Sequence, residues 1–529
     1  MIQYIKKIAP AATLVLAMGL GSCTGDLDVT PIDPSTVMSA DEVALYTKCY
    51  ATMALAGNTG ANGDCDIDGL DGGTSGFVRQ LFNANELPTD EAICCWGDPG
   101  IPAFNYNQYD ASHPMLRGMY YRLTNSISYC NHYLDVCAGI DKQREAEVRF
   151  LRALYYYYMM DLFGNVPFAT EVSTVPQQIK RADLFTWIET EVKDCMTNMA
   201  IPSARTSKDK GYNTADQDAA NLLLARMYLN AEVYTGTARW KDAQTYAELV
   251  INGVHKLWKT GKNGYSAYQM LFMGDNGENG SSQEAILALA LDGKTTTQWC
   301  SSLFLMASTW KADMDVDGNY NCSENWAGNR ARSALVNKFF PNGDAPQVSI
   351  KDMTIAAGDD RALFYGIDRE LVVTTPTEFT SGYSVGKFRN TYTTGEAGHN
   401  SQFPDMDYFL MRSAEAYLIA AEADARQNGG HATTVGLGYI NELRARANTT
   451  QLSACSLNQI LDERSRELYY EGFRRTDLIR YGLYNTSNYL WEWKGGAQNG
   501  TSFSDKLNIY AIPTDDLMTN PNLTQNPGY

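Results

Sequence analysis

The sequence contains few histidines, and they form no group that would bind a catalytic metal. Its five histidines are spread over 529 residues, without an H-E-x-x-H motif or a cysteine–histidine cluster at zinc-site spacing. A glycine-rich phosphate loop and a dinucleotide-binding fingerprint ahead of a helix are also missing. These absences argue against zinc hydrolases and nucleotide-dependent enzymes.

Basic residues are scarce relative to acidic ones. The 43 lysines and arginines against 61 aspartates and glutamates give a formal net charge of −18. A surface this acidic repels phosphate backbones, which argues against a nucleic-acid partner. No stretch beyond residue 20 is apolar for long enough to span a bilayer.

Cysteine pairs of the C-x-x-C type are absent, although the chain has 11 cysteines. The spacings match no disulfide framework, so the connectivity of any disulfides stays open. We expect most of the ten cysteines after Cys23 to be buried as small apolar residues.

The first residues are organised like a lipoprotein signal peptide. Lys6 and Lys7 precede an apolar core at 8–20, and residues 20–23, Leu-Gly-Ser-Cys, form a cleavage site that ends in cysteine. The sequence therefore predicts removal of residues 1–22 and diacylation of Cys23, which would anchor the protein to a membrane.

Most of the remaining chain has apolar residues at three- and four-residue steps, which is typical of packed helices. Helical hairpins are predicted over 214–253 and 410–447, with small residues at their seams as in tetratricopeptide packing. The four tyrosines at 155–158 are expected to point around their helix, only some of them inward. Helix starts are expected at Asp141 and at the capping boxes Thr214 with Gln217 and Ser456 with Gln459.

The stretch 460–482 is heavily charged. Asp462 with Arg466 and Glu471 with Arg475 are each four residues apart, so each pair is expected to meet on one side of a helix. A salt-bridged solvent face accounts for these charges one at a time, but it does not explain their order.

Two stretches, 57–115 and 255–405, are rich in Gly, Asn, Asp, Ser and Thr and show no sustained helical period. Their large aromatics include Trp96, Trp299, Trp310, Tyr320 and Trp326. Each of these rings either packs into the core or stacks on a ligand. The flat C–H face of a sugar suits stacking on indole, while Asn, Asp and Arg bond its hydroxyls.

Residues 313–324 match the spacing of a twelve-residue calcium-binding loop. The expected ligands are Asp313, Asp315, Asp317, Asn319 and Glu324. The flanking residues do not predict two clear helices, so a solvated acidic loop is the alternative.

The residues at 471–478, Glu-Gly-Phe-Arg-Arg-Thr-Asp-Leu, resemble the C-terminal signature of the SusD/RagB family of surface nutrient-binding lipoproteins of Bacteroidetes. The segments 142–167, 411–423 and 510–529 are similar to other parts of that family's pattern. The resemblance implies a mainly α, tetratricopeptide-like superhelix that has no catalytic activity. It also implies that the protein sits on the outer membrane, binds glycan, and acts as a lid on a SusC-like TonB-dependent transporter.

Carried over by position, the resemblance also implies which residues contact the glycan. These are Trp96, Trp299, Tyr320 and Trp326, with Arg79 and Asn105 as polar helpers. We expect residues 23–529 to form one domain, in which helical parts at 23–254 and 406–529 flank the loop-rich insertion 255–405.

Three alternative functions stay open. RagB-like members of the family imply peptide capture instead of glycan capture. A lipid-anchored glycoside hydrolase stays open because such an enzyme needs two carboxylates at a set distance, and the sequence does not give that distance. A tetratricopeptide-type adaptor without a small ligand is the third.

The string 382–386 matches a hydrolase nucleophile elbow, but the residues after it predict extended chain instead of the required helix.

Overall fold

A computed structural model describes residues 41–61, 63, 65–173, 175–317 and 320–529, the side chains of 315–317 excepted. Residues 43–529 form one compact unit. Cys23 and the signal sequence lie outside the described residues.

The chain is mainly helical, as predicted. The α-helices are α2 (Glu42–Ala54), α3 (Gly72–Ser75), α4 (Phe77–Asn85), α5 (Ile101–Asn105), α6 (Pro114–Cys137), α7 (Lys142–Phe163), α8 (Arg181–Met196), α9 (Gln217–Leu229), α10 (Ala231–Thr235), α11 (Trp240–Asn252), α12 (Ala267–Met270), α13 (Ser302–Ala307), α14 (Ser333–Val336), α15 (Ile350–Ala357), α16 (Ser413–Gln427), α17 (Thr434–Arg446), α18 (Leu457–Leu468), α19 (Arg474–Arg480) and α20 (Thr514–Thr519). Short 3₁₀ turns are η1 (Ser281–Glu284), η2 (Ala312–Asp317), η3 (Lys494–Gly496) and η4 (Asp505–Asn508).

The strands are short and pair in antiparallel twos. They are β1 (Ala92–Cys94) with β5 (Asn329–Ala331), β2 (Val166–Phe168) with β3 (Gln177–Ile179), β4 (Ala285–Leu289) with β8 (Tyr408–Arg412), and β6 (Phe364–Tyr365) with β7 (Ser384–Val385). The β1–β5 pair joins the early loop region to the mid-chain insertion, which places segments far apart in sequence next to each other.

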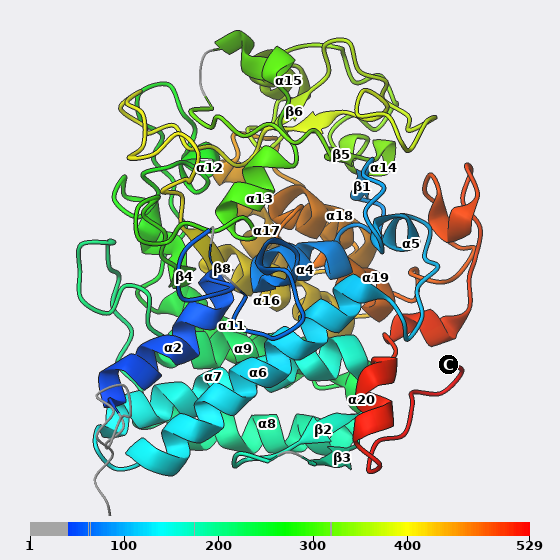
Figure 1. Ribbon diagram of the computed structural model, residues 1–529. Helices are drawn as coiled ribbons and strands as arrows, with labels where there is room; N and C mark the ends of the chain where they lie inside the picture. Colours follow the sequence, from blue (N-terminus) through cyan, green and yellow to red (C-terminus); the bar gives the residue numbers. More distant parts are fainter. Residues whose placement is uncertain (1–40, 62, 64, 174, 318–319) are drawn as a thin grey trace, which may run out of the picture. The chain divides into compact units, whose positions relative to one another are not determined.

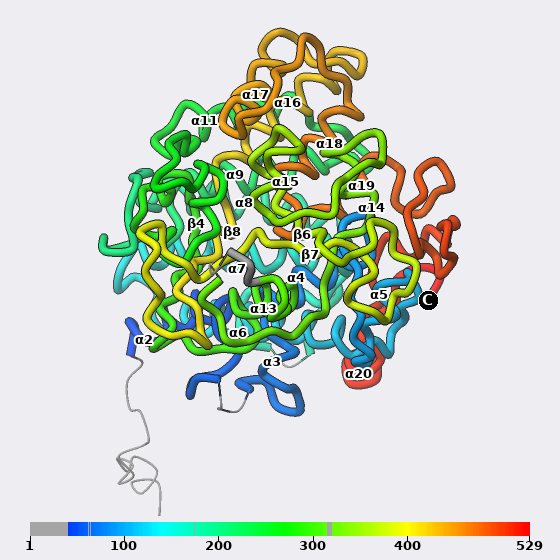
Figure 2. Tube along the Cα trace, turned by 90° about the horizontal axis from the view of Figure 1, so that it is seen from above, coloured from blue at the N-terminus to red at the C-terminus, as the bar shows by residue number. Residues whose placement is uncertain are grey.

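Helical hairpins make up the lower half of Figure 1, and the short elements of the insertion lie above them. Most of the long helices pack against a helix close to them in sequence: α6 on α7, α7 on α8, α9 on α11, and α16 on α17. Helix α16 also packs against α11. The predicted hairpins over 214–253 and 410–447 are therefore confirmed. Seen from above in Figure 2, the insertion covers this layer, and its helix α13 packs against α4.

Two of the three predicted helix starts are confirmed. The Asp141 side chain accepts hydrogen bonds from the N–H groups of Gln143 and Arg144, and the Ser456–Gln459 capping box opens α18. The box predicted at Thr214 is wrong. Asp216 caps α9 instead, because its carboxylate reaches the N–H groups of residues 218 and 219, whereas the Thr214 hydroxyl donates to Gly211 O at 2.9 Å.

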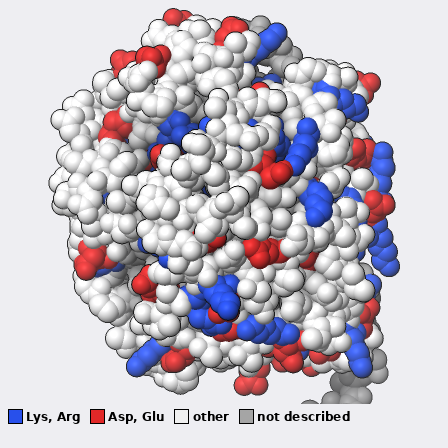
Figure 3. Space-filling model, turned by 180° about the vertical axis from the view of Figure 1, so that it is seen from behind, with Lys and Arg blue, Asp and Glu red and all other residues white. Residues whose placement is uncertain are grey.

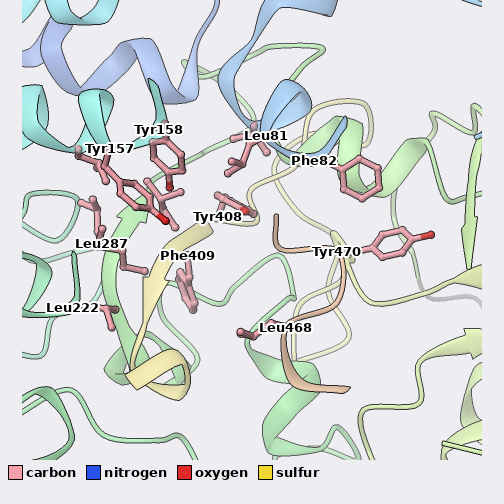
Figure 4. Packing of buried hydrophobic residues seen from close by; sticks show 14 of the residues in the cluster. Leu81, Phe82, Tyr157, Tyr158, Leu222, Leu287, Tyr408, Phe409, Leu468 and Tyr470 are labelled. Atoms are coloured by element: carbon pink, nitrogen blue, oxygen red, sulfur yellow. The ribbon is translucent and has the colours of Figure 1, made fainter. Parts of the chain in front are cut away.

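All four tyrosines at 155–158 are buried, so the expectation that only some point inward is wrong. Their helix α7 lies between α6 and α8 and also touches α9, so at 155–158 it has no side left for solvent. Figure 4 shows Tyr157 and Tyr158 among apolar side chains from α4, β4 and β8. The hydroxyls find internal partners, as when Tyr155 donates to Cys49 O at 2.6 Å.

The regions 57–115 and 255–405 are largely irregular, as expected, but they pack closely. Helix α4 departs from the prediction, because it is a regular helix within 57–115. All of its residues are buried, although Arg79, Gln80 and Asn83 lie on the side opposite its apolar residues. The string 382–386 includes the buried strand β7, so its serine, Ser384, does not stand on a strand-to-helix turn.

Most of the charges around 460–482 lie in the interior instead of facing solvent. Arg412 contacts Glu284 at 2.9 Å, Glu467 at 2.7 Å and Glu471 at 2.7 Å, and all four side chains are buried. Arg361 and Arg446 contact the same group of carboxylates and Glu463. We call these residues the buried ion network: Arg361, Arg412, Arg446, Glu284, Glu463, Glu467 and Glu471.

The helical pairs expected from spacing do not form. Glu471 pairs with Lys387 and Arg412, and Arg475 donates to Asn508 O at 2.6 Å instead of to Glu471. Arg466 pairs with Glu463 at 2.9 Å instead of with Asp462. The charges in this segment therefore pair both with distant residues and with local partners other than the expected ones.

Acid should destabilise the protein through such buried carboxylates. Burial alone would raise the pKa of Glu422, but the guanidinium groups of Arg480, Arg426 and Arg464 lower it from 4.5 to about 2. A carboxyl whose pKa is lower in the folded state contributes stability above its unfolded pKa and loses it as the pH falls through the folded one. The free energy of unfolding should therefore fall between about pH 4.5 and 2, as measured by urea denaturation at several pH values. Constant stability over that range would contradict this.

The described surface is mixed in charge. On the face shown in Figure 3, acidic and basic side chains are scattered among uncharged residues, with no broad basic patch.

Among the ten described cysteines, all of them free thiols, seven are buried, which confirms the expectation that most of them are buried. In the described part of the chain, no helix has the length and apolar character that a bilayer crossing requires.

Candidate functional site

Three tryptophans from separate segments meet at one place. Trp96 follows β1, Trp299 precedes α13, and Trp326 precedes β5. The ring centre of Trp326 lies 6.3 Å from that of Trp96 and 6.3 Å from that of Trp299. All three side chains are partly exposed. We call this set the indole cluster.

The polar atom of each indole already has a partner within the protein. Trp96 Nε1 donates to Trp326 O at 3.0 Å and Trp299 Nε1 donates to Ala61 O at 2.8 Å. Trp326 Nε1 donates to Glu324 Oε2 at 2.7 Å. These bonds fix the ring orientations, and they leave the apolar ring surfaces as what the cluster can offer to a ligand.

The backbone under the cluster is held by the end of α13. Trp326 N donates to Ala307 O at 2.8 Å, and Gly328 N donates to Ser308 O at 2.7 Å. Phe403 packs against Trp299 with ring centres 5.1 Å apart. The aromatic surface is therefore formed before any ligand binds, which lowers the ordering cost of binding.

Gly328→Ala is expected to displace Trp96. A Cβ at position 328 would lie 2.2 Å from the Trp96 ring, too close for any side chain. Ligand affinity should therefore fall about as much as on removing Trp96 itself, while the fold persists because Trp96 is partly exposed. Gly97→Ala is the matched control, since a Cβ there meets nothing within 4 Å. Equal affinities for the two variants would contradict the prediction.

Arg79 lies under the cluster. Its guanidinium sits 5.6 Å from the Trp96 ring centre and 5.1 Å from that of Phe304, and it donates to Gly73 O at 3.0 Å. The side chain is 8% exposed, and burial lowers the pKa of its guanidinium. Arg79 thus packs against the Trp96 ring. Its contact with a ligand stays a prediction.

Two other predicted ligand residues are buried within the fold. Tyr320 is 4% exposed and stacks on Trp310, with ring centres 3.7 Å apart and planes 17° apart, so its face is covered. The buried Asn105 side chain donates to Cys94 O at 2.7 Å and accepts from Cys94 N at 3.1 Å, which holds β1 in place. Neither side chain joins the indole cluster on the surface.

The predicted calcium loop is described only in part. Asp313 contacts Arg369 at 2.8 Å and Lys311 at 3.0 Å, while Glu324 accepts from Trp326 and from Gln402 at 2.8 Å. The side chains of Asp315 and Asp317, and all of Asn319, lie outside the described residues. Elsewhere, the described residues contain no group of three His, Cys, Asp or Glu side chains that would hold a metal. Calcium binding stays a prediction.

The sequence analysis did not identify the residues that hold the indole cluster in place. Phe304 and Phe403 lie behind the indoles, and Gln402 holds the carboxylate that accepts from Trp326. The sequence suggested Glu324 only as a calcium ligand, although its position two residues before Trp326 was a usable signal.

The sequence is similar to those of known proteins. A model of the SusD family matches residues 302–529. The chain is 39% identical to the starch-binding protein SusD of Bacteroides thetaiotaomicron, covering 100% of this chain and 99% of that protein. It is 27% identical to SusD-like protein P25 of Formosa agariphila, covering 73% of each chain.

Solved structures share the fold. A laminarin-binding SusD-like protein has a TM-score of 0.65 at 22% identity, covering 92% of this chain and 99% of that one. A SusD homologue from Bacteroides thetaiotaomicron has a TM-score of 0.67 at 17% identity, covering 95% and 99%. Where the names of these relatives state an activity, it is binding and not catalysis.

Proposed function

The chain belongs to the SusD family, as its residues at 471–478 predicted, and we propose that it binds polysaccharide on the indole cluster. The observation that carries the proposal is the meeting of Trp96, Trp299 and Trp326, with every indole N–H bonded internally. Such a surface offers apolar ring faces, which match the C–H faces of sugar rings.

Binding to this surface is weak per sugar and stronger for a polymer. Three neighbouring rings can contact successive sugars, and a long chain offers many equivalent sites that rebind before the protein diffuses away. The preformed geometry helps because little ordering is required.

A glucan is the first candidate ligand. The relative at 39% identity over the whole chain is named for starch, and a solved relative of the same fold is named for laminarin. Identity over the full chain favours the α-glucan of the first over the glucan of the second.

We further propose that the protein is anchored to the outer membrane through Cys23 and faces the cell exterior. Its sequence motif at 20–23 supports the lipid anchor. In this setting it would hand glycan to a SusC-like TonB-dependent transporter and act as its lid, as the family resemblance implies. Mass spectrometry of the protein extracted from membranes tests the anchor, since an unmodified Cys23 would overturn it.

Native gels that contain polysaccharide test the binding proposal. The purified protein should be retarded in gels loaded with amylopectin, and it should release no reducing ends from it. Release of reducing ends would indicate a hydrolase instead. Retardation by no polysaccharide, together with binding to a peptide mixture, would favour peptide capture.

If residues 313–324 hold calcium, its removal should lower the thermal midpoint of unfolding. The reason is that a ligand bound only by the folded state stabilises that state. The midpoint should drop when EDTA is added and recover with excess Ca²⁺, and Glu324→Gln should abolish the difference. A midpoint unaffected by EDTA would contradict calcium binding by this loop.

A further inference from the structure

A pocket lies apart from the indole cluster in the residues that form it. It has a volume of about 870 Å³ and lies between the 259–269 segment, α15 and the end of α17. This size suits a small organic ligand. Its lining combines polar and apolar groups in similar measure, and among the described residues that form it none belongs to the indole cluster.

Basic side chains outnumber carboxyls among the described residues that line the pocket, although the chain as a whole is acidic. Lys259, Lys351, Arg389 and Arg446 line it, against one carboxyl among its described lining residues, that of Asp360. Lys259 pairs with Glu442, and Arg446 pairs with Glu284 and Glu467. The Asp360 carboxyl accepts from Asn448 Nδ2 at 2.6 Å.

Arg389 is the unusual member of this set. Its side chain is only 7% exposed, yet no carboxylate in the described part of the chain lies within ion-pair distance of it. Within that part, its side chain makes one hydrogen bond, from Nε to Gly386 O at 3.3 Å, and its guanidinium lies 5.4 Å from the Tyr320 ring centre. A nearly buried arginine without a counter-charge costs folding free energy, which an anionic ligand would offset.

Other buried arginines without a carboxylate partner are satisfied differently. Arg330 and Arg332 each donate to several backbone carbonyl groups, so their guanidinium groups are used within the fold. Among the hydrogen bonds of the described residues, none uses the two terminal nitrogens of Arg389. Lys351, which is exposed at the rim, likewise has no acidic partner among the described residues that line the pocket.

We propose that this pocket binds an oxyanion carried by a small ligand, a carboxylate or a sulfate, with Arg389 as its principal contact. A guanidinium presents two parallel N–H groups that match the two oxygens of such a group. Lys351 adds a second positive charge at the entrance. Asn263 and Ser266 line the same pocket and offer polar groups to the rest of the ligand.

Calorimetric titration with glucuronate, inorganic sulfate and glucose tests the proposal. Glucuronate or sulfate should bind saturably and more weakly at high salt, and glucose should not bind at this pocket. Arg389→Gln should weaken binding about tenfold or more. Lys351→Glu, a change at an exposed position that leaves the fold intact, should weaken it at least severalfold. Lys241→Ala, an exposed lysine on α11, and Trp326→Ala should bind like the wild type.

The outcomes separate the ligand classes and the two sites. Binding of glucuronate alone identifies a carboxylate ligand, and binding of sulfate alone identifies a sulfate ester. The proposal is overturned if neither anion binds the wild type, or if Lys351→Glu and Arg389→Gln both retain wild-type affinity. Because polysaccharide retention depends on the indole cluster, its loss or survival does not decide this result.

Discussion

Trp326→Ala is expected to abolish retention of the protein by polysaccharide. Trp326 is the shared neighbour of the other two indoles, and its carbonyl accepts the N–H of Trp96. Removing the ring takes away one stacking face and its contacts with the other two indoles, while the backbone carbonyl that accepts from Trp96 remains. The expected loss is about 2 kcal/mol or more, roughly thirtyfold in affinity, which is enough to remove retardation in a gel.

The same substitution should leave stability nearly unchanged, because the Trp326 side chain is partly exposed and lies at the edge of the core. Trp240→Ala, which removes another partly exposed tryptophan from α11, is the matched control and should be retarded like the wild type. Unchanged retardation of Trp326→Ala would contradict the assignment of the indole cluster.

Arg412→Ala is expected to have the largest effect on stability. Its guanidinium contacts three buried carboxylates, those of Glu284, Glu467 and Glu471. Truncating it leaves these charges without their shared partner in a site that water does not reach. The expected loss is about 3–5 kcal/mol in the free energy of unfolding, measured by urea denaturation.

A surface ion pair provides the control for that experiment. Arg117 and Asp515 are 3.0 Å apart, but their side chains are 39% and 57% exposed. Arg117→Ala should therefore cost no more than about 1 kcal/mol. Equal losses for Arg412→Ala and Arg117→Ala would show that the buried ion network does not stabilise the fold.

Local signals predicted the helices well. Asp141 and the Ser456–Gln459 pair were predictable because a cap bonds to N–H groups two or three residues away. Helix α4 was not predicted, although its apolar and polar residues lie on opposite faces, because its nine residues are a short period within an irregular region.

The ion-pair partners of the charged residues in 460–482 were not predictable from that segment alone. Glu284 and Arg412 are 128 residues apart, and Lys387 and Glu471 are 84 apart. Spacing along one helix gives only neighbours within a turn, whereas these contacts depend on how distant segments pack. The local pair expected for Glu471 failed for this reason, whereas Arg466 pairs with Glu463 on the same helix instead of with Asp462.

The candidate site was predictable in part. Trp96, Trp299 and Trp326 stood out as large aromatics in polar loops, and the structure brings them together. Tyr320 had the same local signal, but Trp310 covers its face. Whether a loop aromatic is covered depends on a partner that the surrounding sequence does not identify.

Diffraction from crystals soaked with a malto-oligosaccharide tests the role of the indole cluster most directly. We expect sugar rings stacked on Trp326 and on Trp96 or Trp299, with little movement of the protein. Sugar bound at another surface while the three indoles stay bare would contradict that role.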